Sequence, residues 1–497
     1  MTRAPVRLSD VVARLEEAGL LVAAPDVDPV VGGISDDSRT VREGDLFCAW
    51  EGTAVDAHRF VADAAESGAV AALVERRVTD AGVPTVVVRD GRRAAAQAAA
   101  VVYDDPSRDA LVVGITGTNG KTTTVWLLRH LLAERHAVAA LGTLGVRLGD
   151  GRVVEAPEAL TTPGPVDLAR TLRTLIDRGT DAVVMETSSH ALDQGRVDAV
   201  GFDAAVFTNL TRDHLDYHDG AAAYRAAKLR LAELVRPGGV LIVNADDPAW
   251  TGLMRGGADR VVRFGMTSPD AEIRAVEVES GTHGSRFRLL TPSGERRVAL
   301  PLLGEFNVAN AVAAAAAATA LGLDLDAIAE RLGSVEQVPG RLERIADSPC
   351  PVLRDYAHSP DALERALDAL RPLVPGRLIL VFGAGGDRDR GKRPAMGAVA
   401  ARGADIAIVT SDNPRTEDPD AIIDEIEAGM ESREHVRETD RRAAIARALA
   451  LAERGDLILL AGKGHETYQV VGGETRPFDE KLIVRGLIDA AAQEVDA

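Results

Sequence analysis

The chain has 497 residues and a formal net charge of −19 at pH 7, with 46% hydrophobic and 27% charged residues. One hydrophobic core does not support a chain of this length, and about 150 residues per domain predicts about three domains. The acidic balance argues against a nucleic-acid partner, because phosphate backbones are bound mainly by clustered Lys and Arg. Cys48 and Cys350 are far apart and lack metal-ligand spacing, which indicates a reducing compartment rather than a disulfide framework.

The sequence contains no segment typical of export or of a membrane span. The first residues lack the apolar core of a signal peptide. The longest apolar run, 308–323, is mostly alanine and includes Asn310 and Thr319, which falls short of the roughly 20 strongly apolar residues that a span requires. We expect a cytoplasmic protein that acts on small molecules without membrane insertion, and the sequence predicts no obligate protein partner.

The first hundred residues are expected to form a small αβ domain, with apolar strands at 71–74 and 85–88. Two turn-rich polar stretches, 104–108 and 337–341, follow further along the chain and are typical of domain boundaries. We therefore predict domains at 1–108, 109–339 and 340–497.

The segment 117–123 reads Gly-Thr-Asn-Gly-Lys-Thr-Thr and lies between an apolar run at 110–115 and a helical pattern at 122–136. Glycines let backbone N–H groups approach a polyphosphate, a helix N-terminus favours anions, Lys121 supplies positive charge, and the Thr122 hydroxyl can reach Mg²⁺. The common loop G-x-x-x-x-G-K-S/T has glycine where this chain has Ile115. The pattern still predicts a loop for ATP or GTP with magnesium, formed by Gly117, Thr118, Asn119, Gly120, Lys121, Thr122 and Thr123.

Apolar runs at 182–185, 204–207 and 240–243 alternate with helical stretches. This alternation predicts a mostly parallel, doubly wound sheet, so the central domain is expected to be a P-loop ATPase-like α/β unit. Glu186 follows the first of these runs, and a carboxylate at a strand tip suits a magnesium ligand beside Thr122 and ATP. A solvated acid is the alternative interpretation.

Two other polar positions in this domain have ordinary explanations when they are considered alone. His214 and His218 are four residues apart, but Leu215 stands where the zinc signature H-E-x-x-H requires glutamate. Lys228 lies in a helical stretch where composition predicts a surface lysine.

The C-terminal third has apolar runs at 378–382, 406–409 and 457–460, which predict a second doubly wound, Rossmann-like α/β unit with functional loops after its strands. The motifs that follow these runs are expected to converge on one pocket: 385–394, Asp-Asn-Pro-Arg at 412–415, and Gly-Lys-Gly-His-Glu at 462–466. Arg388 stands where a dinucleotide fingerprint has its third glycine, so a Rossmann cofactor is not expected. Arginines suit a carboxylate, and Asp412 and Glu466 suit an ammonium group, which predicts a zwitterionic amino acid as ligand.

The shortened phosphate loop resembles that of the Mur ligase family, ATP-dependent amide-forming enzymes of peptidoglycan synthesis, and the resemblance covers nearly the whole chain. It implies that Lys121, His214 and Lys228 are catalytic, with Lys228 carrying a CO₂-derived carbamate. The metal site that it implies comprises Thr122, Glu186, His214 and Lys228. It also implies that Asn307 and Asn310 lie beside the adenine, and that Arg341 and Asp355 approach the nucleotide from the C-terminal domain.

The resemblance further implies where the other substrates bind. The segment 35–47 resembles the part that holds a uridine diphosphate group, where Ser38 is the expected contact. The residues expected to hold the rest of that substrate are Thr161, Thr162, Ser188, Gln194 and Arg196. The residues expected to hold the amino acid are Arg388, Asp412, Asn413, Pro414, Arg415, Gly462 and Glu466.

The Asp-Asn-Pro-Arg string is typical of the family branch that adds meso-2,6-diaminopimelate, whose distal carboxylate needs an anion receptor such as Arg415. We therefore expect a ligase that adds meso-2,6-diaminopimelate to a uridine-linked muramoyl dipeptide through an acyl phosphate. The alternatives are a sibling ligase that uses LL-diaminopimelate or L-lysine, a folylpolyglutamate-type ligase, and a nucleotide-driven switch or binding module.

Overall fold

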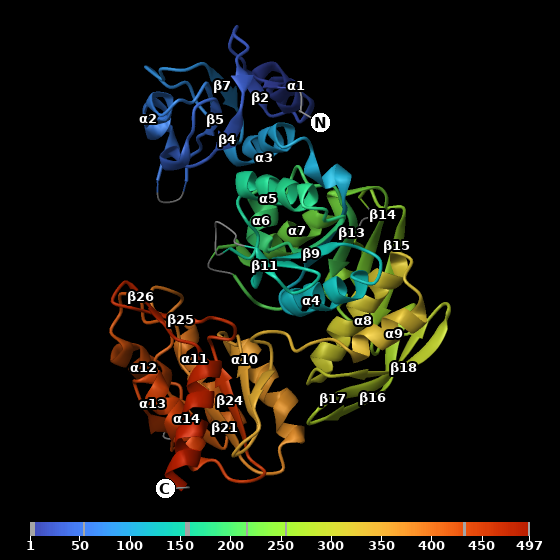
Figure 1. Cartoon of the computed structure of the whole chain (residues 1–497), viewed down its shortest axis with the longest axis vertical. Helices are drawn as coiled ribbons and strands as arrows, with labels where there is room; N and C mark the ends of the chain where they lie inside the picture. Colours follow the sequence, from blue (N-terminus) through green and yellow to red (C-terminus); the bar gives the residue numbers. More distant parts are fainter. Residues whose placement is uncertain are drawn as a thin grey trace. The chain divides into compact units, whose positions relative to one another are not determined.

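The computed structural model describes residues 5–52, 55–154, 160–214, 217–253, 256–430 and 434–495. The chain, coloured along its sequence in Figure 1, divides into two compact units. The first comprises Met1–Arg274, Thr291–Ser293 and Asn310–Ile328, and the second comprises Ala275–Leu290, Gly294–Ala309 and Ala329–Ala497. The two domain boundaries drawn from the sequence stay predictions.

The N-terminal part of the first unit is built on a five-stranded sheet in the order β2-β7-β6-β5-β4. Its strands are β2 (Leu21–Ala23), β4 (Gly33–Ser35), β5 (Asp45–Cys48), β6 (Ala71–Val74) and β7 (Thr85–Val88), and its helices are α1 (Leu8–Glu17), α2 (Val61–Glu66) and α3 (Gly91–Val102). Leu46 and Leu73 pack with α1 and α3, whereas the alternate residues Phe47 and Ala72 pack with α2. Both faces of the sheet are therefore covered, and the strands predicted at 71–74 and 85–88 are confirmed as β6 and β7.

The phosphate-loop strand β8 (Leu111–Thr116) lies between the parallel strands β12 (Ala182–Glu186) and β13 (Phe202–Phe207). The sheet order is β11-β10-β9-β12-β8-β13-β14-β15-β16, continuing through β17 and β18. The other strands are β9 (Val138–Gly142), β10 (Gly145–Leu148), β11 (Val153–Val154), β14 (Val235–Asn244), β15 (Arg260–Gly265), β16 (Ile273–Gly281), β17 (Gly284–Thr291) and β18 (Gly294–Leu300). Strands β9, β12, β8, β13, β14, β15 and β16 pair in parallel in that order, and β10 and β11 are antiparallel additions. The predicted mostly parallel sheet is confirmed.

Helices cover both faces of this sheet. They are α4 (Lys121–Leu132), α5 (Pro165–Asp177), α6 (Ser189–Asp193), α7 (Gly220–Glu233), α8 (Glu305–Ala320) and α9 (Leu325–Gly333). Val112, Val183 and Phe207 pack with side chains of α5, α6 and α7, and α4 contacts β8, β9 and β12, so that α4 lies on the other side of the strands (Figure 1). The helix predicted at 122–136 ends early, at Leu132, because the N–H groups of Glu134 and Arg135 turn to carbonyls three residues back.

The C-terminal part of the second unit has a six-stranded sheet in the order β19-β20-β24-β21-β22-β23. The strands are β19 (Glu343–Ala346), β20 (Val352–Asp355), β21 (Leu378–Phe382), β22 (Ile406–Val409), β23 (Val436–Arg437) and β24 (Leu457–Ala461), beside the hairpin β25 (Tyr468–Val471) and β26 (Glu474–Pro477). Strands β20, β24, β21, β22 and β23 pair in parallel in that order. The predicted Rossmann-like unit is confirmed, with the predicted strand at 457–460 one residue longer.

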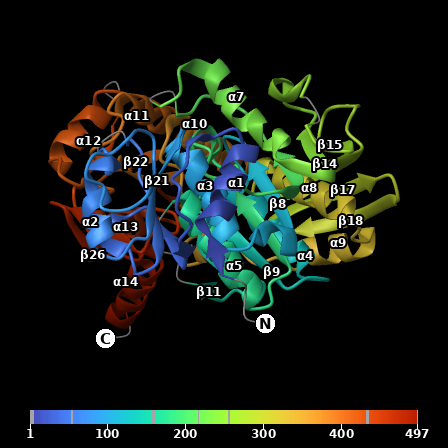
Figure 2. The same cartoon turned by 90° about the horizontal axis from the view of Figure 1, so that it is seen from above.

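Its helices are α10 (Pro360–Leu370), α11 (Lys392–Gly403), α12 (Pro419–Glu427), α13 (Arg441–Leu451) and α14 (Glu480–Val495). Leu380 and Leu459 pack with α10, α11 and α12, whereas the neighbouring Ile379 and Ile458 pack with α13 and α14. Figure 2 shows these two groups of helices on opposite sides of β21 and β22. Within the described ranges, every helix is too short or too polar to cross a membrane.

Candidate active site

The loop between β8 and α4 is shaped by two glycines with positive φ, +151° at Gly117 and +85° at Gly120. A Cβ atom at Gly117 would lie 1.9 Å from Thr208 Oγ1, and one at Gly120 would lie 2.2 Å from Asn310 Oδ1. Any larger side chain would therefore displace a neighbour at either position. The loop is a tight backbone cradle at the N-terminus of α4, where anions are favoured.

The end of the adjacent strand β13 holds this loop in place. The Thr118 N–H donates to the Asn209 carbonyl at 2.7 Å, and the Asn119 N–H donates to Asn209 Oδ1 at 2.9 Å. In return, the Thr208 hydroxyl donates to the Asn119 carbonyl at 2.7 Å. The loop is thus fixed by hydrogen bonds to both main chain and side chains, which preorganises its remaining donors.

Two lysines converge on one carbonyl oxygen of the loop. Lys121 Nζ donates to Gly117 O at 3.0 Å and to Thr118 O at 2.8 Å, and Lys228 Nζ donates to Gly117 O at 2.7 Å. Lys228 is buried, and its ammonium lies 4.5 Å from the ring centre of Tyr224. Burial, and next the positive charge of Lys121, lower the pKa of Lys228 well below that of an ordinary lysine, while Asp213 opposes the shift.

Glu186 ends β12 and is 1% exposed. Its Oε1 accepts the Thr143 N–H at 2.8 Å and its Oε2 accepts the Thr143 hydroxyl at 3.3 Å. Glu186 pairs with Ile115 near the end of β8, and the loop that follows β8 leads to the buried Thr122 in the first turn of α4. The carboxylate and the hydroxyl therefore belong to the same end of the sheet. One carboxylate and one hydroxyl fit a Mg²⁺ ion that takes its other ligands from phosphates and water.

Three histidine and two tyrosine rings form a cluster beside Lys228. The ring centre of His190 lies 4.7 Å from that of His214 and 4.2 Å from that of Tyr217, and His218 lies 5.2 Å from Tyr224. In the part of the chain that the structure describes, no three His, Cys, Asp or Glu side chains gather as a metal-binding group. The predicted set of Thr122, Glu186, His214 and Lys228 contains two such side chains and so needs hydroxyl and carbamate donors as well.

Five residues predicted to hold the nucleotide-sugar substrate form one hydrogen-bonded group. The Thr162 hydroxyl donates to the Glu186 carbonyl at 2.8 Å, and Arg196 Nη1 donates to the Thr162 carbonyl at 3.0 Å. The other links are Arg196 Nε to Gln194 Oε1 at 2.9 Å, Ser188 N to Thr162 Oγ1 at 3.1 Å, and Thr143 Oγ1 to Thr161 Oγ1 at 3.2 Å. Ser38 lies elsewhere in the first unit, at the start of the short helix η1 (Ser38–Thr40) beside the N-terminal sheet.

The residues predicted to contact the nucleoside divide between the units. Asn310 faces Gly120 in the first unit, whereas Asn307, Arg341 and Asp355 belong to the second. There the Asn307 amide donates to the Leu303 carbonyl at 2.8 Å, and the Arg341 guanidinium lies 4.8 Å from a tyrosine ring centre. Burial raises the pKa of Asp355, and the charge of Arg341 opposes the rise.

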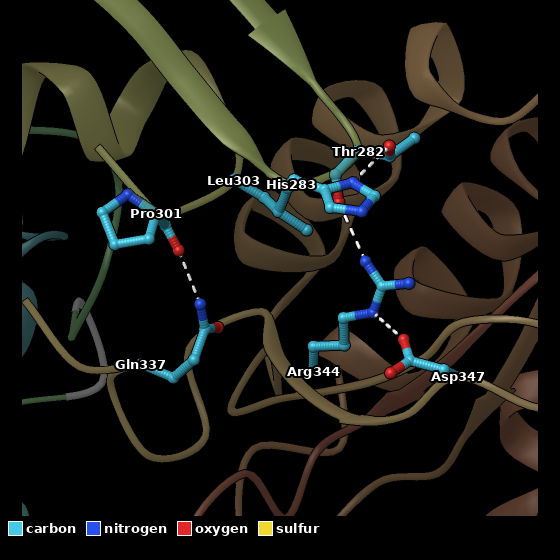
Figure 3. Close-up of a pocket in the computed structure, with 7 residues that line it drawn as sticks. All are labelled: Thr282, His283, Pro301, Leu303, Gln337, Arg344 and Asp347. Atoms are coloured by element: carbon cyan, nitrogen blue, oxygen red, sulfur yellow. Dashed lines mark hydrogen bonds and ion pairs between the residues drawn. The ribbon is translucent and has the colours of Figure 1, made fainter. Parts of the chain in front are cut away.

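A cavity of about 370 Å³ in the second unit is distinct from the predicted site (Figure 3). Its polar side chains already have protein partners, since Gln337 Nε2 donates to the Pro301 carbonyl and Arg344 donates to the Thr282 carbonyl at 3.1 Å. Its lining residues are Thr282, His283, Pro301, Leu303, Gln337, Arg344 and Asp347, and none of them belongs to the set predicted from the sequence. The loops that follow the strands, and not this cavity, therefore form the candidate site.

The three loops that follow β21, β22 and β24 meet in the second unit. The Gly386 N–H donates to the Asn413 carbonyl at 2.9 Å, and the Asn413 amide donates to Glu466 Oε2 at 2.9 Å. Gly462, with φ +114°, leaves room for Asp412, because a Cβ atom there would lie 2.3 Å from Asp412 Oδ2. The Arg415 backbone has φ +53°, and its Nη1 donates to the Gly386 carbonyl at 2.6 Å. The loops thus bring carboxylates and a guanidinium together. Pro414 is buried and Arg388 is exposed.

Comparison with known proteins identifies the family. Three family profiles match in succession: the Mur ligase family catalytic domain at residues 30–112, the Mur ligase middle domain at 115–318, and the Mur ligase glutamate ligase domain at 340–464. The chain belongs to the Mur ligase family. It is 46% identical over 478 residues to UDP-N-acetylmuramoyl-L-alanyl-D-glutamate--2,6-diaminopimelate ligase of Geobacter metallireducens, covering 91% of this chain and 93% of that protein.

Two further similarities extend over nearly the full length of this Mur ligase. The Streptomyces coelicolor protein of the same name is 45% identical over 498 residues, covering 97% of each chain. A solved structure of a ligase of that name has 32% identity and a TM-score of 0.70, and covers 98% of this chain and 100% of its own. The predicted family, fold class and ligase activity are confirmed.

Several residues that shape this Mur ligase site were not predicted from the sequence. Thr208 and Asn209 hold the phosphate loop. The sequence feature that could have indicated them is their position directly after β13, the strand adjacent to β8. Lys463 stood within the Gly-Lys-Gly-His-Glu motif, yet it is fully buried against the carboxylates of the second unit. Arg393 is also fully buried, and it pairs with Glu417 and Glu425 beneath the loop that carries Arg388.

Proposed function

We propose that this ligase joins meso-2,6-diaminopimelate to UDP-N-acetylmuramoyl-L-alanyl-D-glutamate at the expense of ATP. The names of the similar ligases support this substrate pair. The structural observation that carries the proposal is the convergence of Asp412, Arg415 and Glu466 in one group of loops. Two carboxylates suit the distal ammonium of the amino acid, and the guanidinium suits its distal carboxylate.

The chemistry requires an activated carboxylate, because an ionised carboxylate resists attack by an amine. A carboxylate oxygen of the D-glutamyl residue attacks the γ-phosphorus of ATP, and ADP leaves. The diaminopimelate amine then attacks the acyl carbon, gives up a proton and expels phosphate. Lys121 and the N-terminus of α4 oppose the charge that accumulates on the transferring phosphoryl group.

The residues that would hold magnesium are Thr122 and Glu186, aided by His214. The buried Glu186 carboxylate is already oriented by two hydrogen bonds from Thr143, as expected of a ligand that must not rotate. When bound, the ion neutralises phosphate charge.

Lys228 is proposed to carry a carbamate. A buried amine with a lowered pKa is neutral in a larger fraction of molecules, and the neutral amine is the form that attacks CO₂. The nitrogen forms a bond to the carbon of CO₂ and loses a proton, so a cation becomes an anion beside Lys121. The remaining roles are proposed as the resemblance implies them: Asn307, Asn310, Arg341 and Asp355 at the nucleoside, and Ser38, Thr161, Thr162, Ser188, Gln194 and Arg196 at the uridine-linked substrate.

One assay tests this function. The purified enzyme receives ATP, magnesium and UDP-N-acetylmuramoyl-L-alanyl-D-glutamate, with meso-diaminopimelate, LL-diaminopimelate or L-lysine in separate reactions, and ADP and the ligated product are measured. We expect kcat/KM to be highest for the meso isomer. A preference for lysine or the LL isomer would refute the proposed amino acid. ADP release at a rate that does not depend on any of the three amino acids would refute the ligase mechanism.

A further inference from the structure

A buried lysine lies behind the carboxylates of the amino-acid pocket. Lys463 is 0% exposed, which is rare for lysine unless it is paired. Its Nζ lies 3.3 Å from Glu466 Oε2 and 3.8 Å from Asp412 Oδ1, and it donates to Asn413 Oδ1 at 3.1 Å. One ammonium thus contacts three of the residues proposed to bind the substrate.

The guanidinium of the same pocket is left without a carboxylate. Among the ion pairs of the described residues, none includes Arg415, whose Nη1 donates to the Gly386 carbonyl instead. Glu466 lies nearby, since the Gly386 N–H donates to the Asn413 carbonyl and the Asn413 amide donates to Glu466 Oε2. The carboxylates that could pair with Arg415 are therefore turned toward Lys463.

The formal charges of this pocket leave one negative charge for the substrate. Asp412 and Glu466 carry two formal negative charges, and Lys463 cancels one of them, which leaves one for a single substrate ammonium. Without Lys463, Glu466 would have an unpaired charge in a partly buried place, and the neighbouring guanidinium would be its best partner. Arg415 would then be occupied when the substrate arrives.

We propose that Lys463 is a positioning residue that holds Asp412 and Glu466 away from Arg415 and so reserves Arg415 for a carboxylate of the substrate. This inference rests on the proposed function. The proposed role differs from a general role in stability, because it affects the binding of the amino acid and not that of ATP or the uridine-linked substrate.

The test is the KM of each of the three substrates in wild type and Lys463→Met. KM does not depend on the fraction of enzyme that folds, so a poorly folding variant still gives a usable value. Loss of a charge-assisted interaction predicts a rise of about ten- to a hundredfold in the KM for diaminopimelate, with less than about threefold change for ATP and the uridine-linked substrate. A matched control is Lys481→Met, which removes an exposed lysine paired with Glu343 in the same unit, and all three KM values should stay near those of wild type.

A double variant tests the proposed route through Glu466. In a Glu466→Gln background the nearer of the two competing carboxylates, 3.3 Å from Lys463 Nζ in wild type, is already absent, so adding Lys463→Met should raise the KM for diaminopimelate by a clearly smaller factor than it does in wild type. Equal rises in all three KM values, no rise for diaminopimelate, or independent effects in the double variant would each overturn the inference. If wild type prefers another amino acid of the panel, the proposed function fails, and the same comparison with that amino acid still tests Lys463.

Discussion

Lys228 Nζ lies 2.7 Å from the carbonyl oxygen of Gly117, to which it donates a hydrogen bond. This contact joins helix α7 to the first glycine of the phosphate loop, 111 residues earlier in the chain. Lys121 donates to the same oxygen, so the two cations are neighbours, and their repulsion adds to burial in lowering the pKa of Lys228. A lysine that composition assigns to the surface is thus buried against the glycine loop that follows β8.

The first prediction is that Lys228→Ala loses nearly all phosphate release, because the variant lacks the side chain proposed to carry the anionic carbamate. A small carboxylic acid such as acetate should restore part of the activity by supplying the missing anion. The measurement is phosphate release with and without acetate, and acetate should leave the wild-type rate unchanged. Full activity of the variant without acetate would remove Lys228 from the mechanism.

The second prediction compares two glycines of the first unit. Gly120 and Gly145 have positive φ values of +85° and +76°, but a Cβ atom would collide with Asn310 only at Gly120, and Gly145 has nothing within 4 Å. Alanine at either position costs roughly 1–2 kcal/mol of backbone strain, so both variants should lose a few degrees in Tm. Only Gly120→Ala should also raise the KM for ATP, by about tenfold or more, because the phosphate cradle must shift.

Thermal unfolding and the KM for ATP together decide this comparison. A rise in KM for Gly145→Ala as large as that for Gly120→Ala would show that strain, and not the contact with Asn310, controls nucleotide binding.

The buried parallel strands could be predicted from the sequence, because a strand covered on both faces is a continuous apolar run. Residues 71–74, 85–88, 378–382 and 406–409 form strands with those bounds. Strands β16 to β18 were not predicted, since charged residues such as Arg296 and Arg297 on β18, both of them exposed, interrupt the apolar pattern. The local sequence also failed to indicate the end of α4, where the hydrogen bonds change from four-residue to three-residue spacing.

The site could be predicted only as far as its motifs extend along the chain. The loop glycines and the Asp-Asn-Pro-Arg string are contiguous, so their residue types indicate their chemistry. The contact of Lys228 with Gly117, and that of Lys463 with Asp412, each depend on how distant segments pack. Neither periodicity nor composition carries that information, because both describe neighbours along the chain and not neighbours in space.

The third prediction concerns acid stability. A hydrogen bond from the buried Arg393, followed by one from the Asp387 N–H, lowers the pKa of Glu417 from 4.5 to about 2. Because the folded pKa lies below the unfolded one, this carboxylate stabilises the fold above about pH 4.5, and that contribution is lost as the pH falls toward about 2. Glu417→Gln should therefore be less stable than wild type at pH 7, and the difference should shrink steadily below pH 4.5.

Urea unfolding at pH 7, 5, 4 and 3 measures this difference. Glu474→Gln is the control, because Glu474 forms an exposed pair with Arg476, and exposed pairs contribute little. A gap between wild type and Glu417→Gln that stays constant down to pH 3 would contradict the proposed linkage.

The last prediction concerns the choice of amino acid and depends on Arg415. Its backbone lies in the left-handed region, at φ +53°, a conformation that costs a non-glycine residue about 1–3 kcal/mol and tends to occur at functional sites. In Arg415→Ala the distal carboxylate of diaminopimelate would lose a charge-assisted hydrogen bond worth roughly 1.5–3 kcal/mol, so its apparent affinity should fall about ten- to a hundredfold. Lysine lacks that carboxylate and should lose far less. The decisive measurement is the ratio of kcat/KM for diaminopimelate to that for lysine in wild type, Arg415→Ala and the control Arg476→Ala, whose side chain is exposed on the neighbouring hairpin. An unchanged ratio in Arg415→Ala would place the specificity determinant on another loop, with Arg388 as the next guanidinium to test.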